Sequence, residues 1–329
     1  MQQLTQQLKS GKMEILEVPF PSLGKGQVLV RNYYSVISAG TEGKTVSDAR
    51  KGYIAKARSR QKEVKQVIEL IKINGLLVTY KLVMNKLEAP AALGYSCAGE
   101  VIGVGEGVDN FKVGDFVACG GQGAYHADVV SVYQNLCVKA PPTVELKHAA
   151  FATIASIAIQ GIRQADLRFG ESCVIIGLGL VGQIAVELLN AAGIKTIGVD
   201  IDDKQVEAAK KCGAAFSFNR TQQGIEKSIN EHTHGIGADA VIITAATSSL
   251  DPINFAGEIC RKKGKVVIVG AVPTGFERTN YYKKELELLM SSSYGPGRYD
   301  INYEEKSIDY PVGYVRWTEN RNMQSLLIC

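Results

Sequence analysis

The sequence has few of the residues that usually build metal sites and disulfide frameworks. Its 329 residues include four histidines, one tryptophan and seven cysteines, and no two cysteines are spaced as C-x-x-C. An odd, scattered set of cysteines is typical of small apolar core residues in a reducing compartment. The pattern therefore predicts neither a disulfide framework nor a cysteine-rich metal motif.

Long apolar segments and strong charge are also missing. The first residues, MQQLTQQLKSGKMEI, contain no apolar core of a signal peptide, and no run of about 18 apolar residues occurs. The net charge of +4 is small for this length and gives no reason to expect nucleic acid as a partner. We therefore predict a cytoplasmic protein with no membrane or nucleic-acid partner.

The sequence does contain a glycine-rich turn between an apolar strand and a helix. Cys173 to Ile176 has the pattern of a buried strand, and the next residues have the spacing G-x-G-x-x-G. In this motif the first glycine permits a tight turn, the second lets a pyrophosphate approach, and the third allows close helix packing. The predicted cofactor-binding residues of this turn are Gly177, Gly179, Leu180, Val181 and Gly182.

An acidic residue follows the next predicted strand. Asp200 comes directly after the strand-like segment Lys195 to Val199 and lies 18 positions after Gly182 (200 − 182). An acid at this place accepts hydrogen bonds from the adenosine ribose and repels a 2′-phosphate. The sequence therefore favours NAD over NADP, with NADP as the second choice because Lys204 lies nearby.

Strand and helix patterns alternate beyond this point, which is typical of a doubly wound parallel sheet. Ligands bind at the carboxyl ends of such strands. Further cofactor contacts are therefore predicted at Thr244, Ala245, Val269 and Gly270.

Residues 1–150 have a different pattern. Glycines punctuate β-branched residues between 94 and 117, which indicates a small β-barrel. A helical insert interrupts it at about 46–90. Residues 50 to 65 hold seven basic residues and one glutamate. They form either a solvated helix face or a rim that attracts an anionic substrate.

The segments KVGDFVACGGQGAYHADVV and VIIGLGLVG, in this order, resemble the medium-chain dehydrogenase/reductases, the zinc-type alcohol dehydrogenase superfamily. The resemblance covers nearly the whole chain outside the insert. It implies an α/β protein with a GroES-like substrate and catalytic domain at 1–150 and a Rossmann NAD-binding domain at 151–293. It also implies a C-terminal segment, 294–329, that returns toward the first domain.

A closer resemblance is to the N-terminal half of two-part bacterial oxidoreductases, carried by SAGTE, SYGPGRYD and DYPVGYVRWTENRN. In those proteins a Gfo/Idh/MocA-type domain follows, and this chain stops at Cys329, about where that domain would begin. A homo-oligomer and a separate partner of that type are therefore the two expected assemblies. The same resemblance places Arg298 against the cofactor pyrophosphate.

The zinc ligands of the superfamily do not carry over. Ala39, Tyr95 and Ser156 stand at the three catalytic ligand positions, and only Cys119 remains where the structural zinc lobe has four cysteines. Alanine cannot ligate, and neutral serine or tyrosine are poor substitutes. The resemblance therefore implies a zinc-free protein.

Without a metal, a side chain must act on the substrate oxygen. Tyr95 is the predicted hydrogen-bond donor, and Thr41 and Lys44 occupy the positions of the proton relay. Alternatively, Tyr95 only fills the volume that the metal would occupy. The leading function is a zinc-independent, NAD-dependent oxidoreductase acting on a sugar-like or polyol-like substrate. The alternatives are an NADPH-dependent quinone or enoyl reductase, and a dinucleotide-binding module whose chemistry needs a separate partner.

Overall fold

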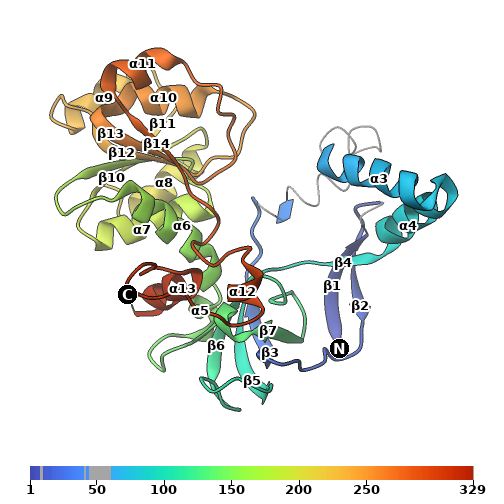
Figure 1. Ribbon diagram of the computed structural model, residues 1–329. Coiled ribbons are helices and arrows are strands. Elements are labelled where there is room, and N and C mark those ends of the chain that lie inside the picture. The colour runs from blue at the N-terminus through green and yellow to red at the C-terminus, as the bar shows by residue number, and fades with distance from the viewer. Residues whose placement is uncertain (8–9, 41, 44–60, 329) are drawn as a thin grey trace. The chain divides into compact units, whose positions relative to one another are not determined.

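A computed structural model describes residues 1–7, 10–40, 42–43 and 61–328 (Figure 1). The predicted relay residues Thr41 and Lys44 and most of the basic run from 50 to 65 lie outside the described residues. The chain divides into two compact units, Met1–Phe151 and Ala152–Cys329.

Antiparallel strands build the first unit. Five of them form a sheet in the order β7-β3-β5-β6-β8, and three form a second sheet in the order β2-β1-β4. The predicted β-rich first domain is therefore confirmed. The strands are β1 (Gln2–Gln7), β2 (Met13–Glu17), β3 (Gln27–Ser35), β4 (Pro90–Ala92), β5 (Ser96–Val104), β6 (Phe116–Gly120), β7 (Val129–Tyr133) and β8 (Cys137–Lys139).

The central pair β3 and β5 depends on a glycine. A Cβ atom at Gly99 would lie 1.9 Å from the carbonyl oxygen of Arg31 on the neighbouring strand. The register of the pair shifts twice, and one shift falls between Asn32 and Tyr34. Glycine is typical of places where two backbones approach this closely. The end of β3, which carries Ser35, is positioned by this irregular pairing.

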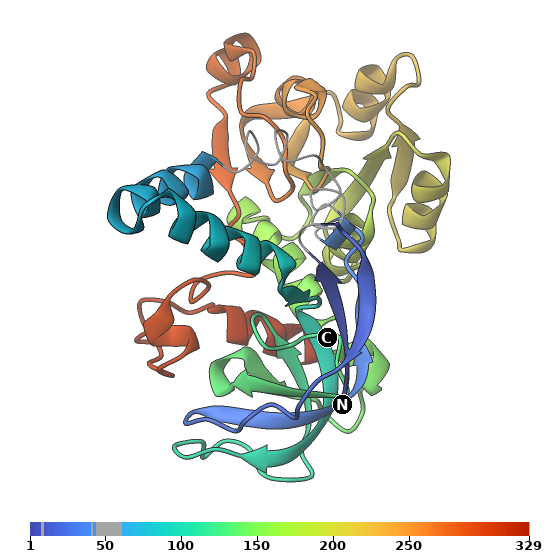
Figure 2. The same ribbon diagram turned by 90° about the vertical axis from the view of Figure 1, so that its right-hand side faces the viewer.

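The helical insert forms an antiparallel pair in the described part of the chain (Figure 2). Helix α3 (Gln61–Asn74) and helix α4 (Leu76–Glu88) are separated by Gly75, whose φ of 76° is left-handed. A short helix, α5 (Leu146–Ala149), ends the unit.

The second unit is built on a six-stranded parallel sheet with the order β11-β10-β9-β12-β13-β14. Numbered from β9, this is the order 3-2-1-4-5-6 of doubly wound dinucleotide-binding folds. The order reverses between β9 and β12, so a ligand is expected at their carboxyl ends. The strands are β9 (Ser172–Ile176), β10 (Lys195–Asp200), β11 (Phe216–Asn219), β12 (Ala238–Ile243), β13 (Cys260–Ile268) and β14 (Glu287–Met290).

Helices cover both faces of this sheet. Along β9, Val174 and Ile176 pack into one core cluster, and Cys173 and Ile175 pack into the other. Side chains alternate between the faces of a strand, so a continuous apolar run is buried on both sides. One face is covered by α9 (Ile225–His232), α10 (Asp251–Ile259) and α11 (Arg278–Lys284), and the other by α6 (Ala152–Ala165), α7 (Leu180–Ala191) and α8 (Asp203–Lys211).

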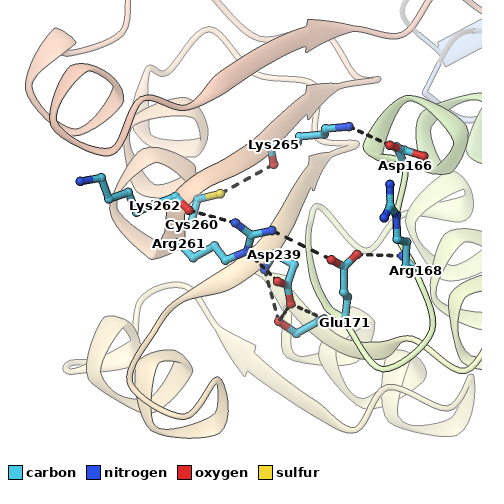
Figure 3. A network of polar contacts seen from close by, with 9 residues as sticks. Asp166, Arg168, Glu171, Asp239, Cys260, Arg261, Lys262 and Lys265 are labelled. Atoms are coloured by element: carbon cyan, nitrogen blue, oxygen red, sulfur yellow. Dashed lines mark hydrogen bonds and ion pairs between the residues drawn. The ribbon is translucent and has the colours of Figure 1, made fainter.

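The amino ends of the strands are joined by a polar network (Figure 3). Asp239 accepts hydrogen bonds from the amide and hydroxyl of Ser172, at 2.8 and 2.9 Å, and from Arg261 Nε at 2.6 Å. Burial disfavours the charged carboxylate, but the hydrogen bonds from Ser172 and Arg261 outweigh it and lower the pKa of Asp239. The network links the starts of β9, β12 and β13 and leaves the opposite edge of the sheet for a ligand.

The C-terminal residues pack on the second unit. Helix α12 (Ile301–Glu304) is short, and α13 (Glu319–Ile328) packs against α6. Arg163 of α6 donates to Asn322 Oδ1 at 2.8 Å and stacks over Trp317 at 3.4 Å. The return of 294–329 toward the first domain stays a prediction.

Candidate functional site

The glycine loop lies at the carboxyl end of β9. A Cβ atom on Gly177 would lie 2.6 Å from the amide nitrogen of Ala245, and one on Gly182 would lie 2.0 Å from the oxygen of Gly177. Gly179 has no heavy atom within 4 Å of its ideal Cβ position. The first and third glycines are therefore required by close packing, and the second leaves open space.

The ends of the neighbouring strands lie beside this loop. The hydroxyl of Thr244 donates to the oxygens of Gly177 and Ile176. A Cβ on Gly270 would lie 2.1 Å from the oxygen of Ala245, and the Val269 amide donates to Ile243 at 2.9 Å. The structure thus brings Thr244, Ala245, Val269 and Gly270 to the same edge as the glycine loop.

The Asp200 carboxylate already holds part of this loop. It accepts from the Leu178 amide at 2.6 Å and from the Asp202 amide at 3.0 Å. Asp202 caps α8 by accepting from the Lys204 amide at 2.9 Å, and Asp203 accepts from Asn219 at 2.6 Å. Three carboxylates, of Asp200, Asp202 and Asp203, therefore lie at the carboxyl end of β10, and a 2′-phosphate would meet their combined negative charge.

This edge fits a dinucleotide. Helix α7 begins at Leu180, so the amides of Leu180, Val181 and Gly182 belong to the first turn, where N–H groups have no intrahelical acceptor. The open space at Gly179 and the positive end of the helix dipole suit a pyrophosphate. These residues would hold the cofactor, and Asp200 would accept from its ribose.

Arg298 lies in a buried polar cluster of the C-terminal segment. Its guanidinium pairs with Glu304 at 2.6 Å and stacks on the ring of Tyr299 at 4.1 Å. Its Nε and the Tyr294 hydroxyl are buried without a partner among the described residues. The predicted contact of Arg298 with the pyrophosphate stays a prediction, and binding a phosphate there would compete with Glu304.

Glu319 belongs to the same cluster and gives a stability prediction. Its side chain is 0% exposed, and both carboxyl oxygens are unpartnered in the part of the chain described. Burial, and then the charge of Glu304, raise its pKa from 4.5 to about 9. The unfolded chain loses this proton near pH 4.5 while the folded chain keeps it, so stability falls as the pH rises between these values. The slope is about 1.4 kcal/mol per pH unit.

We therefore expect Glu319→Gln to be more stable than wild type at pH 7 and to lack this slope between pH 5 and 9. Urea unfolding at several pH values measures it. Glu305→Gln, an exposed neighbour, is the control and should keep the wild-type slope. Parallel curves for wild type and Glu319→Gln would contradict the prediction.

In the first unit, the Tyr95 hydroxyl is buried and has no hydrogen-bond partner among the described residues. The adjacent Ser96 hydroxyl is engaged, since it donates to the Ala150 oxygen at 2.6 Å. Gly94, with a φ of 99°, has no room for a side chain, because a Cβ would lie 2.6 Å from the His126 amide. The phenol is thus a buried donor with no acceptor in the part of the chain that the structure describes.

The positions that the resemblance assigns to zinc ligands do not fit the metal. Ala39 has no donor atom, and the Ser156 hydroxyl donates within its own helix to the Ala152 oxygen at 2.7 Å. Among the residues that the structure describes, no three His, Cys, Asp or Glu side chains are grouped as metal ligands.

A polar chain close to Tyr95 was not predicted from the sequence. His126 Nδ1 lies 2.8 Å from Ser35 Oγ, and its Nε2 lies 2.9 Å from Glu42 Oε2. Both ring nitrogens of His126 therefore have a partner. The chain joins residues 91 and 84 positions apart, so no local spacing signals it.

Comparison with known proteins identifies the class that this fold defines. A family model for the zinc-binding dehydrogenase domain matches residues 181–306, and one for the alcohol dehydrogenase GroES-like domain matches residues 61–154. Both models describe domains of zinc-type alcohol dehydrogenases, and they support the predicted resemblance to the medium-chain dehydrogenase/reductases.

Individual relatives match part of the chain. Sorbitol dehydrogenase of Bacillus subtilis is 31% identical over 213 residues, covering 56% of this chain and 60% of that protein. D-guloside 3-dehydrogenase of Escherichia coli is 33% identical over 174 residues, covering 51% and 49%. The chain thus spans about half to three fifths of the length of these relatives.

Solved structures share the fold over the whole chain. Galactitol-1-phosphate dehydrogenase from Escherichia coli has a TM-score of 0.72 at 17% identity, covering 100% of this chain and 89% of that one. A mycobacterial protein complexed with NADPH has a TM-score of 0.68 at 16% identity, covering 100% and 87%. These likenesses establish the GroES-like and Rossmann folds.

No helix in the described ranges is long and apolar enough to cross a bilayer.

Proposed function

We propose that this protein is a zinc-independent, NAD-dependent oxidoreductase that transfers hydride to or from a hydroxyl or carbonyl group of a sugar-like or polyol-like substrate. The observation that carries the proposal is the glycine loop at the switch point of the sheet, with Asp200 bonded to its Leu178 amide. Relatives named for sorbitol and guloside dehydrogenation support the substrate class.

The nicotinamide ring, when bound, accepts or supplies the hydride. The amides at the start of α7 would hold the pyrophosphate, and Asp200 would select an unphosphorylated ribose. Tyr95 would donate a hydrogen bond to the substrate oxygen, where charge develops during the reaction. Thr41 and Lys44 remain the proposed relay, and Arg298 a proposed pyrophosphate contact. A cytoplasmic protein acting as a homo-oligomer or with a Gfo/Idh/MocA-type partner is part of the same proposal.

A mechanism without zinc is supported by the side chains at the ligand positions, since Ala39 has no donor atom and the neutral hydroxyl of Ser156 is already bonded to the Ala152 oxygen. The two alternatives differ in cofactor and in self-sufficiency. The reductase alternative requires a preference for NADPH, and the partner-dependent alternative requires dinucleotide binding without turnover.

One experiment separates these functions. NAD and NADP affinities are measured by calorimetry, and oxidation of a panel of polyols and sugars is followed at 340 nm before and after chelator treatment. We expect tighter binding of NAD, and turnover that survives chelation while a zinc-dependent dehydrogenase treated in parallel is inactivated. Stoichiometric zinc in the purified protein, or loss of turnover on chelation, would show that zinc takes part. A preference for NADPH would favour the reductase.

A further inference from the structure

The hydrogen-bonded chain of Ser35, His126 and Glu42 has the geometry of a nucleophile, a base and an orienting acid. Ser35 ends β3 and is exposed, whereas the side chains of His126 and Glu42 are only 8% and 10% exposed. The contacts of 2.8 and 2.9 Å lie within the range for proton transfer along such a chain. An exposed hydroxyl is thus joined to a buried carboxylate through one imidazole.

The acid and the base are both held in place. Glu42 Oε1 accepts from the Ser38 amide at 2.8 Å, and the hydrogen bonds from His126 and Ser38 lower the pKa of Glu42 despite the opposing effect of burial. An ionised Glu42 accepts a hydrogen bond from a protonated Nε2 of His126. The lone pair of Nδ1 is then left to accept a hydrogen bond from the Ser35 hydroxyl. The His126 amide donates to the Leu93 oxygen at 2.8 Å, and the residue packs against Gly94.

We propose that Ser35, His126 and Glu42 form a nucleophilic triad that hydrolyses esters with a small apolar acyl group. This activity is separate from the dinucleotide chemistry. Such triads are recognised by geometry and role rather than by sequence order. Ile37, which lies two residues after Ser35 and is 67% exposed, supplies apolar surface for the acyl group.

The reaction balances without a further reagent. Ser35 Oγ bonds to the ester carbonyl carbon while its proton passes to His126 Nδ1. The bond from that carbon to the alcohol oxygen breaks, and the alcohol leaves with the proton. Water then attacks the acyl-serine, giving its proton to His126, and the carboxylic acid leaves as the proton returns to Ser35. Glu42 is a positioning residue that stabilises the imidazolium.

A fluorophosphonate probe tests the nucleophile directly, because it phosphonylates activated serines. The full chain is labelled and digested, and the adduct is located by mass spectrometry. We expect a single adduct on Ser35 in the native protein, none in the urea-unfolded protein and none in Ser35→Ala. Hydrolysis of p-nitrophenyl acetate should fall roughly 100-fold or more in Ser35→Ala and in His126→Gln.

Glu42→Gln tests the positioning role, since the amide keeps the shape but cannot stabilise the imidazolium. It should slow labelling of Ser35 while the melting temperature stays within a few degrees of wild type. Ser10→Ala is the matched control and should label like wild type, since this exposed serine donates to Gln7 Oε1 and accepts from the Lys12 amide, with no histidine partner in the described structure. Absence of labelling, an adduct on another residue, or equal labelling rates in wild type and Glu42→Gln would overturn the triad. NAD affinity should be unchanged in Ser35→Ala, so this test is independent of the oxidoreductase proposal.

Discussion

Replacing Tyr95 by phenylalanine should reduce turnover by roughly 100- to 1,000-fold, because it removes one donor aimed at the substrate oxygen. The structure adds a second expectation for stability. The phenol hydroxyl is buried without a partner among the described residues, so its removal relieves an unsatisfied polar group worth about 1–3 kcal/mol. Tyr95→Phe should therefore melt at the same temperature as wild type or above it, with unchanged NAD affinity.

Tyr95→Ala separates catalysis from packing. If the ring only fills space, Phe should be nearly silent in turnover and Ala should mainly lower the melting temperature through the cavity that it leaves. Initial rates with the best substrate of the polyol panel, together with thermal melts of both variants, distinguish the two cases. A Phe variant that melts well below wild type would mean that the hydroxyl is bonded within the protein, contrary to the structure described here.

Removing the carboxylate of Asp200 should weaken NAD binding by at least about tenfold for each ribose hydrogen bond that is lost. A hydrogen bond to a charged group contributes about 1.5–3 kcal/mol, and 1.4 kcal/mol corresponds to a factor of ten. Asp200→Ala also frees the Leu178 amide, to which the carboxylate is bonded at 2.6 Å, so part of the loss reflects a loosened glycine loop.

Asp200→Asn isolates the charge, since the amide keeps the size and one acceptor oxygen. It should narrow the preference for NAD over NADP, because less negative charge then faces a 2′-phosphate. Asp203 is a nearby acid bonded to Asn219. Asp203→Asn is therefore the control for the electrostatic potential at this edge of the sheet, and it should change the preference for NAD over NADP less than Asp200→Asn does. Calorimetric titration with both dinucleotides measures this, and unchanged NAD affinity in Asp200→Ala would place the adenosine ribose elsewhere.

The two units differ in how much of the candidate site can be predicted from the sequence. In the second unit the predicted cofactor residues come from one local motif and from the ends of successive strands. In a parallel sheet such ends lie at one edge whatever the loops between them do. The alternation of strands and helices was therefore enough to predict that Thr244 and Gly270 lie at strand ends on the same edge of the sheet as the glycine loop, and in the structure Thr244 bonds to Gly177 while Gly270 packs against Ala245.

The sequence by itself determined the fold class, the glycine loop and the acid that ends β10, because these depend on short-range backbone geometry and on the periodicity of apolar residues. It did not predict the Ser35, His126 and Glu42 chain, nor the burial of Glu319 without a partner among the residues described. Both depend on strand register and on loop paths that join distant segments, and one residue of slip in β3 would turn Ser35 to the other face of its sheet. Only the tertiary structure decided which polar side chains of this protein are paired, which are orphaned, and which face each other.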